Sequence, residues 1–299
     1  MASRIIEFFG YDPADTSSAA RQARKEEYCP FLGDTCQKTL SDGLISGACT
    51  LQAVRGTPVI CCPIRLYANN YEILRDVATI AFQQKVDLYP GAKATHAAQK
   101  EGHVRIAVFG RGWGGELHIP NRGRSGSYFV DWILARLNKT GELEDFIAVE
   151  VQSIDTTGNY REERDAYIRG EKFEEYSTAG FNWENVNKRI LPQLIYKGHV
   201  LRRERLCKSG LYFVCPLPVY DKIRERLGGN IAKYEPQPGA LTFIWYDVGS
   251  ATPKGQIREL KRIDKFTTTV DQVAVAFTSP SNLPEANVYE RAIRSELVP

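Results

Sequence analysis

Two polar side chains interrupt a hydrophobic run at residues 146–154, whose sequence is FIAVEVQSI. Residues two apart on a strand project from the same face, so Glu150 and Gln152 are expected to point the same way, roughly 6 to 7 Å apart. A buried carboxylate needs a partner or a metal ion, because an isolated charge is costly to bury. The pair is therefore a candidate for chemistry, while a charged edge strand that resists aggregation is the structural alternative.

A third polar side chain interrupts the preceding apolar run, YFVDWILARL at residues 128–137. The segment NKTGELED between the two runs is typical of a turn, with Gly141 at its bend. Together the runs predict a β-hairpin with Asp131 on one strand and Glu150 and Gln152 on the next. Asp131 and Glu150 can then converge on one divalent cation.

Oxygen ligands at this hairpin suit Mg²⁺, an ion that activates water and stabilises a phosphate leaving group. The Gln152 carbonyl can join such a site, or its amide can donate to a water molecule or a phosphate oxygen. Glu116, in the Gly-rich stretch RGWGGELHIPNRGRSGS, could supply a further carboxylate. The carboxylates and the Gln152 amide together predict a metal site that could act on phosphate groups.

Five of the seven cysteines fall within the first 62 residues. Without a secretion signal, such a cluster favours metal binding or reactive thiols over disulfides. Turn-rich pieces surround Cys29, Cys36, Cys49 and Cys62, whose four thiolates would complete a closed tetrahedral site for iron or zinc, the structural type. Cys61 directly precedes Cys62 and leaves the fourth ligand open, and scattered buried thiols are the alternative.

The surrounding periodicities predict an α/β fold. Residues 71–86 carry an amphipathic helical pattern, and residues 103–110 alternate as a strand. A helix broken or kinked at Pro192 leads to an apolar strand at 210–220 that could return beside the hairpin. A hairpin, a crossover helix and a returning strand make a mixed sheet flanked by helices, whereas residues 1–66 predict an irregular, loop-rich lobe.

The formal net charge of +3 is only mildly basic, so binding to a polyanion would require clustered positive charges. Residues 196–208, which include Lys197, and residues 254–265 form two such clusters. Either could contact phosphates or place an arginine on guanine, and a salt-bridged exposed face is the alternative. No stretch of eighteen apolar residues occurs and the amino terminus is mixed polar, so we expect a cytoplasmic protein with no membrane partner.

The chain resembles the NotI-type group of type II restriction endonucleases, within the PD-(D/E)xK nuclease superfamily. The resemblance covers most of the chain and rests on EEYCPFLGDTCQKT, SGACTL, VICCPIRL, GGEL, the Asp131 strand and AVEVQSIDTTGNYR. It implies a PD-(D/E)xK nuclease core with a mixed central sheet flanked by helices. In this reading residues 1–70 form a small, loop-rich, four-cysteine metal-binding lobe packed on the core, and residues 71–299 form the core with its DNA-recognition elements.

The resemblance also assigns roles to residues. It implies a catalytic set in which Asp131 and Glu150 hold Mg²⁺, and it implies structural iron in the four-cysteine site. The catalytic set is Glu116, Asp131, Glu150 and Gln152, and the iron ligands are Cys29, Cys36, Cys49 and Cys62. Gln152 stands where most relatives have a lysine, so the metal and nearby arginines would have to supply the missing positive charge. Arg122, Arg124 and Arg161 are the candidates by position.

The expected activity is Mg²⁺-dependent hydrolysis of phosphodiester bonds in double-stranded DNA at a specific, G·C-rich palindromic site in a prokaryotic cell. A palindrome implies a two-fold homodimer, for which the tail ANVYERAIRSEL at residues 286–297 is one candidate surface. One alternative is a non-catalytic, metal-stabilised, sequence-specific DNA-binding protein. Another is an iron–thiolate redox or sensor protein, which explains neither the hairpin carboxylates nor the basic segments.

Overall fold

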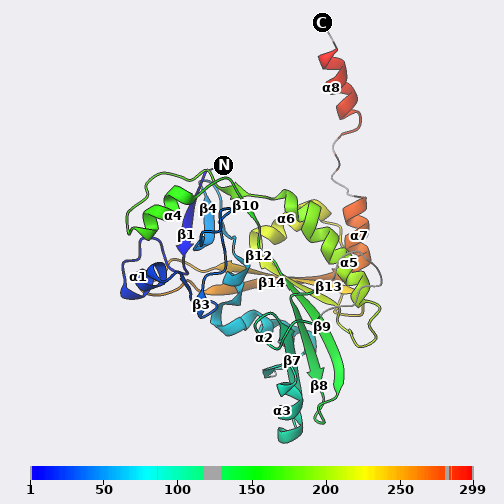
Figure 1. The fold of residues 1–299 in the computed structure, drawn as a ribbon. Helices are drawn as coiled ribbons and strands as arrows, with labels where there is room; N and C mark the ends of the chain where they lie inside the picture. Colours follow the sequence, from blue (N-terminus) through cyan, green and yellow to red (C-terminus); the bar gives the residue numbers. More distant parts are fainter. Residues whose placement is uncertain (1, 86, 118–128, 280–282, 284, 298–299) are drawn as a thin grey trace.

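A seven-stranded mixed sheet forms the centre of the protein (Figure 1). The computed structural model describes residues 2–85, 87–117, 129–279, 283 and 285–297. The strand order across the sheet is β14-β13-β12-β9-β8-β7-β6. The strands are β6 (Leu88–Pro90), β7 (Arg105–Gly110), β8 (Trp132–Leu137), β9 (Leu143–Val151), β12 (Leu211–Pro216), β13 (Ala240–Val248) and β14 (Leu260–Thr269).

The order of the strands confirms the expected hairpin and crossover. β8 runs antiparallel to both β7 and β9, and Gly141 takes a positive φ of 85° in the turn between β8 and β9. β12 then returns parallel to β9, with β13 parallel to β12 and β14 antiparallel at the edge. The α/β class and the mixed sheet are thus confirmed, and the assignment to the PD-(D/E)xK type stays a prediction.

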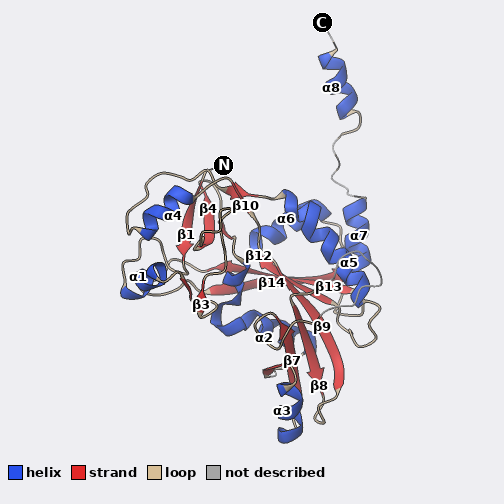
Figure 2. Ribbon diagram, viewed as in Figure 1, coloured by secondary structure: helices blue, strands red, loops and turns tan. Residues whose placement is uncertain are grey.

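Helices cover both faces of this sheet (Figure 2). Neighbouring residues on a strand point to opposite faces, and Trp245 and Tyr246 on β13 show this directly. The Trp245 ring stacks on Tyr220 of α6 (Leu217–Leu227) at a centroid distance of 3.6 Å. The Tyr246 hydroxyl donates to Asp76 of α2 (Ala68–Phe82) over 2.7 Å. Helices α6 and α2 therefore lie on opposite faces.

Two expected elements differ in extent from the structure. The strand expected at 210–220 ends at Pro216, because Pro218 lies in the first turn of α6, where its missing N–H costs no helical hydrogen bond. The helix expected at 71–86 is α2, but Asn69, Asn70 and Tyr71 adopt left-handed backbone angles. The regular part of α2 begins only after these three residues.

The segment between β9 and β12 crosses over the sheet. It contains α4 (Arg161–Ile168), the short strand pair β10 (Thr156–Thr157) and β11 (Gly180–Phe181), a π-helical turn η2 (Val186–Ile190) and α5 (Leu191–Leu201). The helix does not break at Pro192: Ile190 and Leu191 keep right-handed helical angles, and the π-helical turn passes directly into α5, with Pro192 in its first turn.

The amino-terminal region is more regular than its sequence indicated. It contains an antiparallel sheet of order β1-β4-β5 and a small β2-β3 ladder. The elements are β1 (Ser3–Phe8), α1 (Ser18–Lys25), β2 (Tyr28–Cys29), β3 (Asp34–Thr35), β4 (Ala48–Ala53), β5 (Pro58–Ile60) and the 3-10 helix η1 (Pro63–Tyr67). The expectation of an irregular lobe at 1–66 was wrong for β1, β4 and β5.

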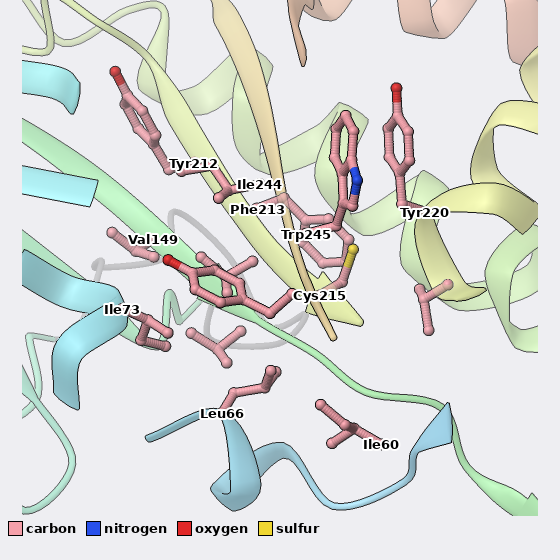
Figure 3. Close-up of a cluster of buried hydrophobic side chains, with 14 of the residues drawn as sticks. Ile60, Leu66, Ile73, Val149, Tyr212, Phe213, Cys215, Tyr220, Ile244 and Trp245 are labelled. Carbon is pink, nitrogen blue, oxygen red and sulfur yellow. The ribbon is translucent and has the colours of Figure 1, made fainter. Parts of the chain in front are cut away.

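One continuous hydrophobic core joins this region to the central sheet. Ile60 and Leu66 lie in the same buried cluster as Val149, Phe213 and Ile244 (Figure 3). Glu7 and Arg65 form a buried ion pair, 3.0 Å apart. Arg65 also donates to the Arg258 carbonyl, which links the amino-terminal region to the segment before β14. The division at residue 70 stays a prediction.

The remaining helices lie at the periphery. α3 (Lys93–Glu101) packs on β6 and β7, and α7 (Val270–Thr278) packs on α5. α8 (Val288–Glu296) has no buried residue and stands away from the body (Figure 1). Within the described ranges, no helix is both long and apolar enough to cross a membrane.

Candidate active site

The register of the β8–β9 hairpin sets two carboxylates opposite each other. Trp132 pairs with Val149, so the next position outward places Asp131 across from Glu150. The Val151 N–H donates to Asp131 Oδ2 over 2.8 Å, which fixes the orientation of that carboxylate. The hairpin therefore brings together the two side chains expected to bind Mg²⁺.

Asp131 and Gln152 lie one residue outside the strands on which they were expected. β8 begins at Trp132 and β9 ends at Val151. The Gln152 N–H still donates to the Val214 carbonyl over 3.0 Å, so the chain stays extended beside β12 at this point. The prediction that the polar groups sit together at one end of the hairpin holds, although only Glu150 is inside a strand.

These side chains line an open cleft of about 1030 Å³. Its walls come from the end of β9 and the segment after it, from α5, and from the amino-terminal region. Residues used below that line it are Lys38, Asp131, Glu150, Gln152, Arg161 and Lys197. The cysteine-bearing region thus borders the same cleft as the hairpin carboxylates.

The electrostatics of the cleft are dominated by two carboxylates, of which Glu150 is buried and Asp131 is exposed to the cleft. Glu150 is only 7% exposed, and this burial, followed by the nearby Asp131 carboxylate, raises the pKa of Glu150 to about 7. Although the Asp131 side chain is exposed, desolvation by the protein around it raises the pKa of this carboxyl, against the lowering effects of the Val151 N–H and the Lys197 ammonium, and the Glu116 charge adds to the rise. A site that holds two such groups favours the arrival of a cation.

Lys197 contacts this carboxylate pair, although the sequence placed it only in a basic segment. Its Nζ lies 2.6 Å from Glu150 Oε1, and its side chain is 15% exposed. Leu194, Gly198 and Leu201 are buried along the same helix. Lys197 follows Leu194 by three residues and precedes Gly198, so it lies within that buried stripe. This helical spacing was the signal in the sequence that Lys197 points inward.

The other charged candidates fall into three groups. Glu116 is exposed, and its effect on Asp131 is electrostatic. Arg161 lines the cleft and pairs with Asp42 of the amino-terminal region. Arg122 and Arg124 lie outside the described residues.

Several cations of the two basic segments pair with acidic residues away from the cleft. Arg202 pairs with Asp271 over 2.6 Å. Arg258 and Arg262, from the second segment, pair with Asp12 and Asp76. None of residues 254–265, all of which the structure describes, lines the cleft that holds Glu150. For these three arginines, the alternative interpretation of the basic segments, pairing with acidic residues rather than contact with phosphates, is therefore the one that fits.

All seven cysteines lie among the described residues, where they are buried and carry free thiols. Burial raises the pKa of Cys49 well above its usual value, and the neighbouring Cys62, Cys29 and Cys36 thiols add to this rise. Those are the four cysteines expected as ligands, so the fold gathers them in one neighbourhood. No group of three or more His, Cys, Asp or Glu side chains in the described part of the chain is arranged to hold a metal ion.

Cys61 differs from Cys62 in what it touches. Lys38 Nζ donates to Cys61 Sγ over 3.1 Å and to the Cys61 carbonyl over 3.0 Å. Burial raises the pKa of Cys62, Lys38 opposes this rise, and Cys61 and Cys36 add to it, while Cys62 itself is the largest charge acting on Cys49. The ligand set stays a prediction, and these contacts favour Cys62 over Cys61 as its fourth member.

The model of the restriction endonuclease NotI family matches residues 14–208. The chain belongs to this family. The match includes the cysteine set, the β8–β9 hairpin and Lys197, and it makes the protein a site-specific DNA endonuclease that binds DNA. Among curated proteins no match was found. A type II restriction endonuclease of the NotI family must bring a phosphodiester bond to a site that can hydrolyse it, and the cleft described above holds the carboxylates suited to that task.

Proposed function

We propose that this NotI-family enzyme hydrolyses phosphodiester bonds in double-stranded DNA in the presence of Mg²⁺, with Asp131 and Glu150 as the metal-binding carboxylates. The observation that carries the proposal is the register that sets Asp131 opposite Glu150 in the cleft. Gln152 and Glu116 complete the proposed catalytic set. The expected target is a G·C-rich palindrome, which a two-fold homodimer would cut once on each strand.

The residues at the site fit Mg²⁺. The Val151 N–H bonds to Oδ2 of Asp131, and Lys197 bonds to Oε1 of Glu150, which also accepts from the Asp131 backbone; each carboxylate can still offer lone pairs to a cation in the cleft. Mg²⁺ is commonly bound through one or two carboxylates and keeps several waters, so a site without a third carboxylate in place is sufficient. When bound, the ion would lower the pKa of a water and neutralise charge on the phosphate.

The side chains themselves orient the reactants. Asp131 is held by the backbone, so its free oxygen keeps a fixed direction across the cleft. Gln152 directs its amide to the attacking water or to a phosphate oxygen, because it can donate and accept hydrogen bonds. In the hydrolysis the water oxygen bonds to phosphorus while the bond from phosphorus to the leaving strand breaks. The burial of Glu150 excludes bulk water from one side of this centre.

The proposal is tested with Asp131→Ala and Glu150→Ala. We expect both variants to retain specific DNA binding and to lose Mg²⁺-dependent cleavage. Glu144→Ala is a matched control, since Glu144 lies on the same strand but is more exposed and pairs with Arg136. Incubation with plasmid DNA and Mg²⁺, followed by sequencing of the fragment ends, identifies the target and the cut position. Near wild-type cleavage by either cleft variant would show that the assignment is wrong.

A structural iron or zinc site is the second part of the proposal. Cys29, Cys36, Cys49 and Cys62 would hold the ion, with no role in the chemical step, because four thiolates leave no open position. Mutual proximity of these buried thiols supports the set. Elemental analysis of protein purified without added metal tests it, and the absence of stoichiometric iron or zinc contradicts it.

A further inference from the structure

The proposed site has an unbalanced charge. Asp131 and Glu150 bring two negative charges to a cleft that must also receive a negatively charged phosphate. Gln152 is neutral and cannot offset them. Lys197 lines the cleft and bonds to one of the two carboxylates. Two other cleft cations have acidic partners away from this pair, since Arg161 pairs with Asp42 and Arg189 with Asp155.

The helix that carries Lys197 is held firmly in place. A Cβ at Gly198 would stand 2.3 Å from a Val270 side-chain carbon, so the glycine permits the close approach of α5 to α7. Leu194 and Leu201 bury the same side of α5. Pro192 sits in the first turn, where its fixed φ suits the helix. The direction of the Lys197 side chain into the cleft therefore follows from packing on both sides of it.

We infer that Lys197 is the phosphate-contacting cation of this site, carried on α5 and held by Glu150 in the place that a lysine at position 152 would otherwise occupy. The inference rests on the proposed function. An ammonium group has three N–H donors, and Glu150 Oε1 accepts one of them. The other two are left for an acceptor in the cleft that Lys197 lines, where a phosphate oxygen would accept them and the charge would offset that of the carboxylates.

The test exchanges the positions of the lysine. Lys197→Met removes the charge, and Gln152→Lys in the same chain returns it from the end of β9. DNA binding is measured without metal, in EDTA, on a short duplex that carries the mapped cut site, over a range of salt concentrations. Cleavage is measured separately at saturating Mg²⁺. Lys188→Met is the control, because Lys188 precedes α5, is exposed and pairs with Glu184.

We expect Lys197→Met to weaken metal-free binding by about tenfold, the lower end for loss of a hydrogen bond to a charged group. The slope of log affinity against log salt should fall by about one, as for loss of one phosphate contact. Cleavage should slow by about 10²-fold to 10³-fold, the effect of removing one donor that stabilises developing charge. Gln152→Lys should recover most of the lost metal-free affinity and of the salt slope, although it removes the Gln152 amide from the catalytic set, and Lys188→Met should change neither binding nor cleavage.

Two outcomes would overturn the inference. In the first, Lys197→Met binds with the wild-type salt slope. In the second, the Gln152→Lys/Lys197→Met protein binds the duplex in EDTA no more tightly than Lys197→Met alone. Lys197→Arg guards against a folding defect, since it keeps the charge and should keep the salt slope. A wild-type protein that cuts no DNA would contradict the proposed function, whereas a cutting wild type with an equally active Lys197→Met would contradict the role of Lys197 alone.

Discussion

The raised pKa of Glu150 predicts that this carboxylate lowers the stability of the metal-free protein as pH increases. Burial and the Asp131 charge move the pKa of Glu150 from its ordinary 4.5 to about 7. Between these values the folded protein keeps a proton that the unfolded chain has released. Raising the pH through this window therefore favours unfolding, because the folded state binds more protons than the unfolded state.

The magnitude follows from the same two values. One unit of pKa difference corresponds to about 1.36 kcal/mol, so the complete effect is about 3 kcal/mol above pH 7. Between about pH 5 and pH 8 the linked change in the free energy of unfolding is about 2 to 3 kcal/mol. Glu150 is 7% exposed, so solvent screening reduces this figure little. Below pH 4.5 Glu150 causes no loss of stability, and the full loss is reached as the pH rises through 7.

Glu150→Gln removes the titrating group and keeps the shape. Urea unfolding of wild type and variant in EDTA, at several pH values from about 5 to 8, gives the free energy of unfolding of each. We expect the free energy of unfolding of the variant to rise relative to that of the wild type by about 2 to 3 kcal/mol across this range. A difference that stays constant with pH would refute the reasoning, since it would show that Glu150 titrates alike in the folded and unfolded states. Glu144→Gln, at a more exposed position on the same strand, serves as the control.

Three further predictions concern other parts of the chain. Arg65→Met leaves the buried Glu7 charge unpaired and should lower the free energy of unfolding by about 3 to 5 kcal/mol in chemical denaturation. Cys62→Ser should reduce bound iron or zinc in elemental analysis, while Cys61→Ser, which disturbs a contact to a lysine, should retain it. Gly158→Ala should weaken DNA binding in an anisotropy titration, because this cleft residue has a φ of 70° and an added Cβ would stand 2.3 Å from a backbone carbonyl oxygen.

The hairpin could be predicted from the sequence because its signals are local. The apolar run that holds FIAVEV, the apolar run before it and Gly141 between them indicate two strands and a turn within one short stretch of chain. The register places Asp131 opposite Glu150 without any information from distant segments. Only the strand ends differed, by one residue at Asp131 and at Gln152.

In the amino-terminal sheet β4 and β5 form a local hairpin, but the pairing of β1 escaped prediction because it is not local. β1 pairs with β4, so Ile5 faces Leu51 across a long intervening segment. The short alternation in SRIIEF was the available signal, since Ser3 and Ile5 are buried and Arg4 is not. Turns, glycines and cysteines between these strands obscured the pattern, and the lobe was taken as irregular.

Lys197 illustrates why the rest of the site needed the fold. Lys197 is 47 residues from Glu150 in the sequence. Because Arg202, Arg203 and Arg205 follow it closely, the segment resembles a basic run exposed to solvent. Only the crossover connection, which lays α5 over the cleft before β12 returns beside β9, brings the Lys197 ammonium to the carboxylate. A lysine at position 152 would be fixed by the strand, whereas one on α5 is fixed by the packing of a helix. The charge at the active site should therefore be sensitive to mutations in the contact between α5 and α7, such as Gly198→Ala, that leave the hairpin untouched.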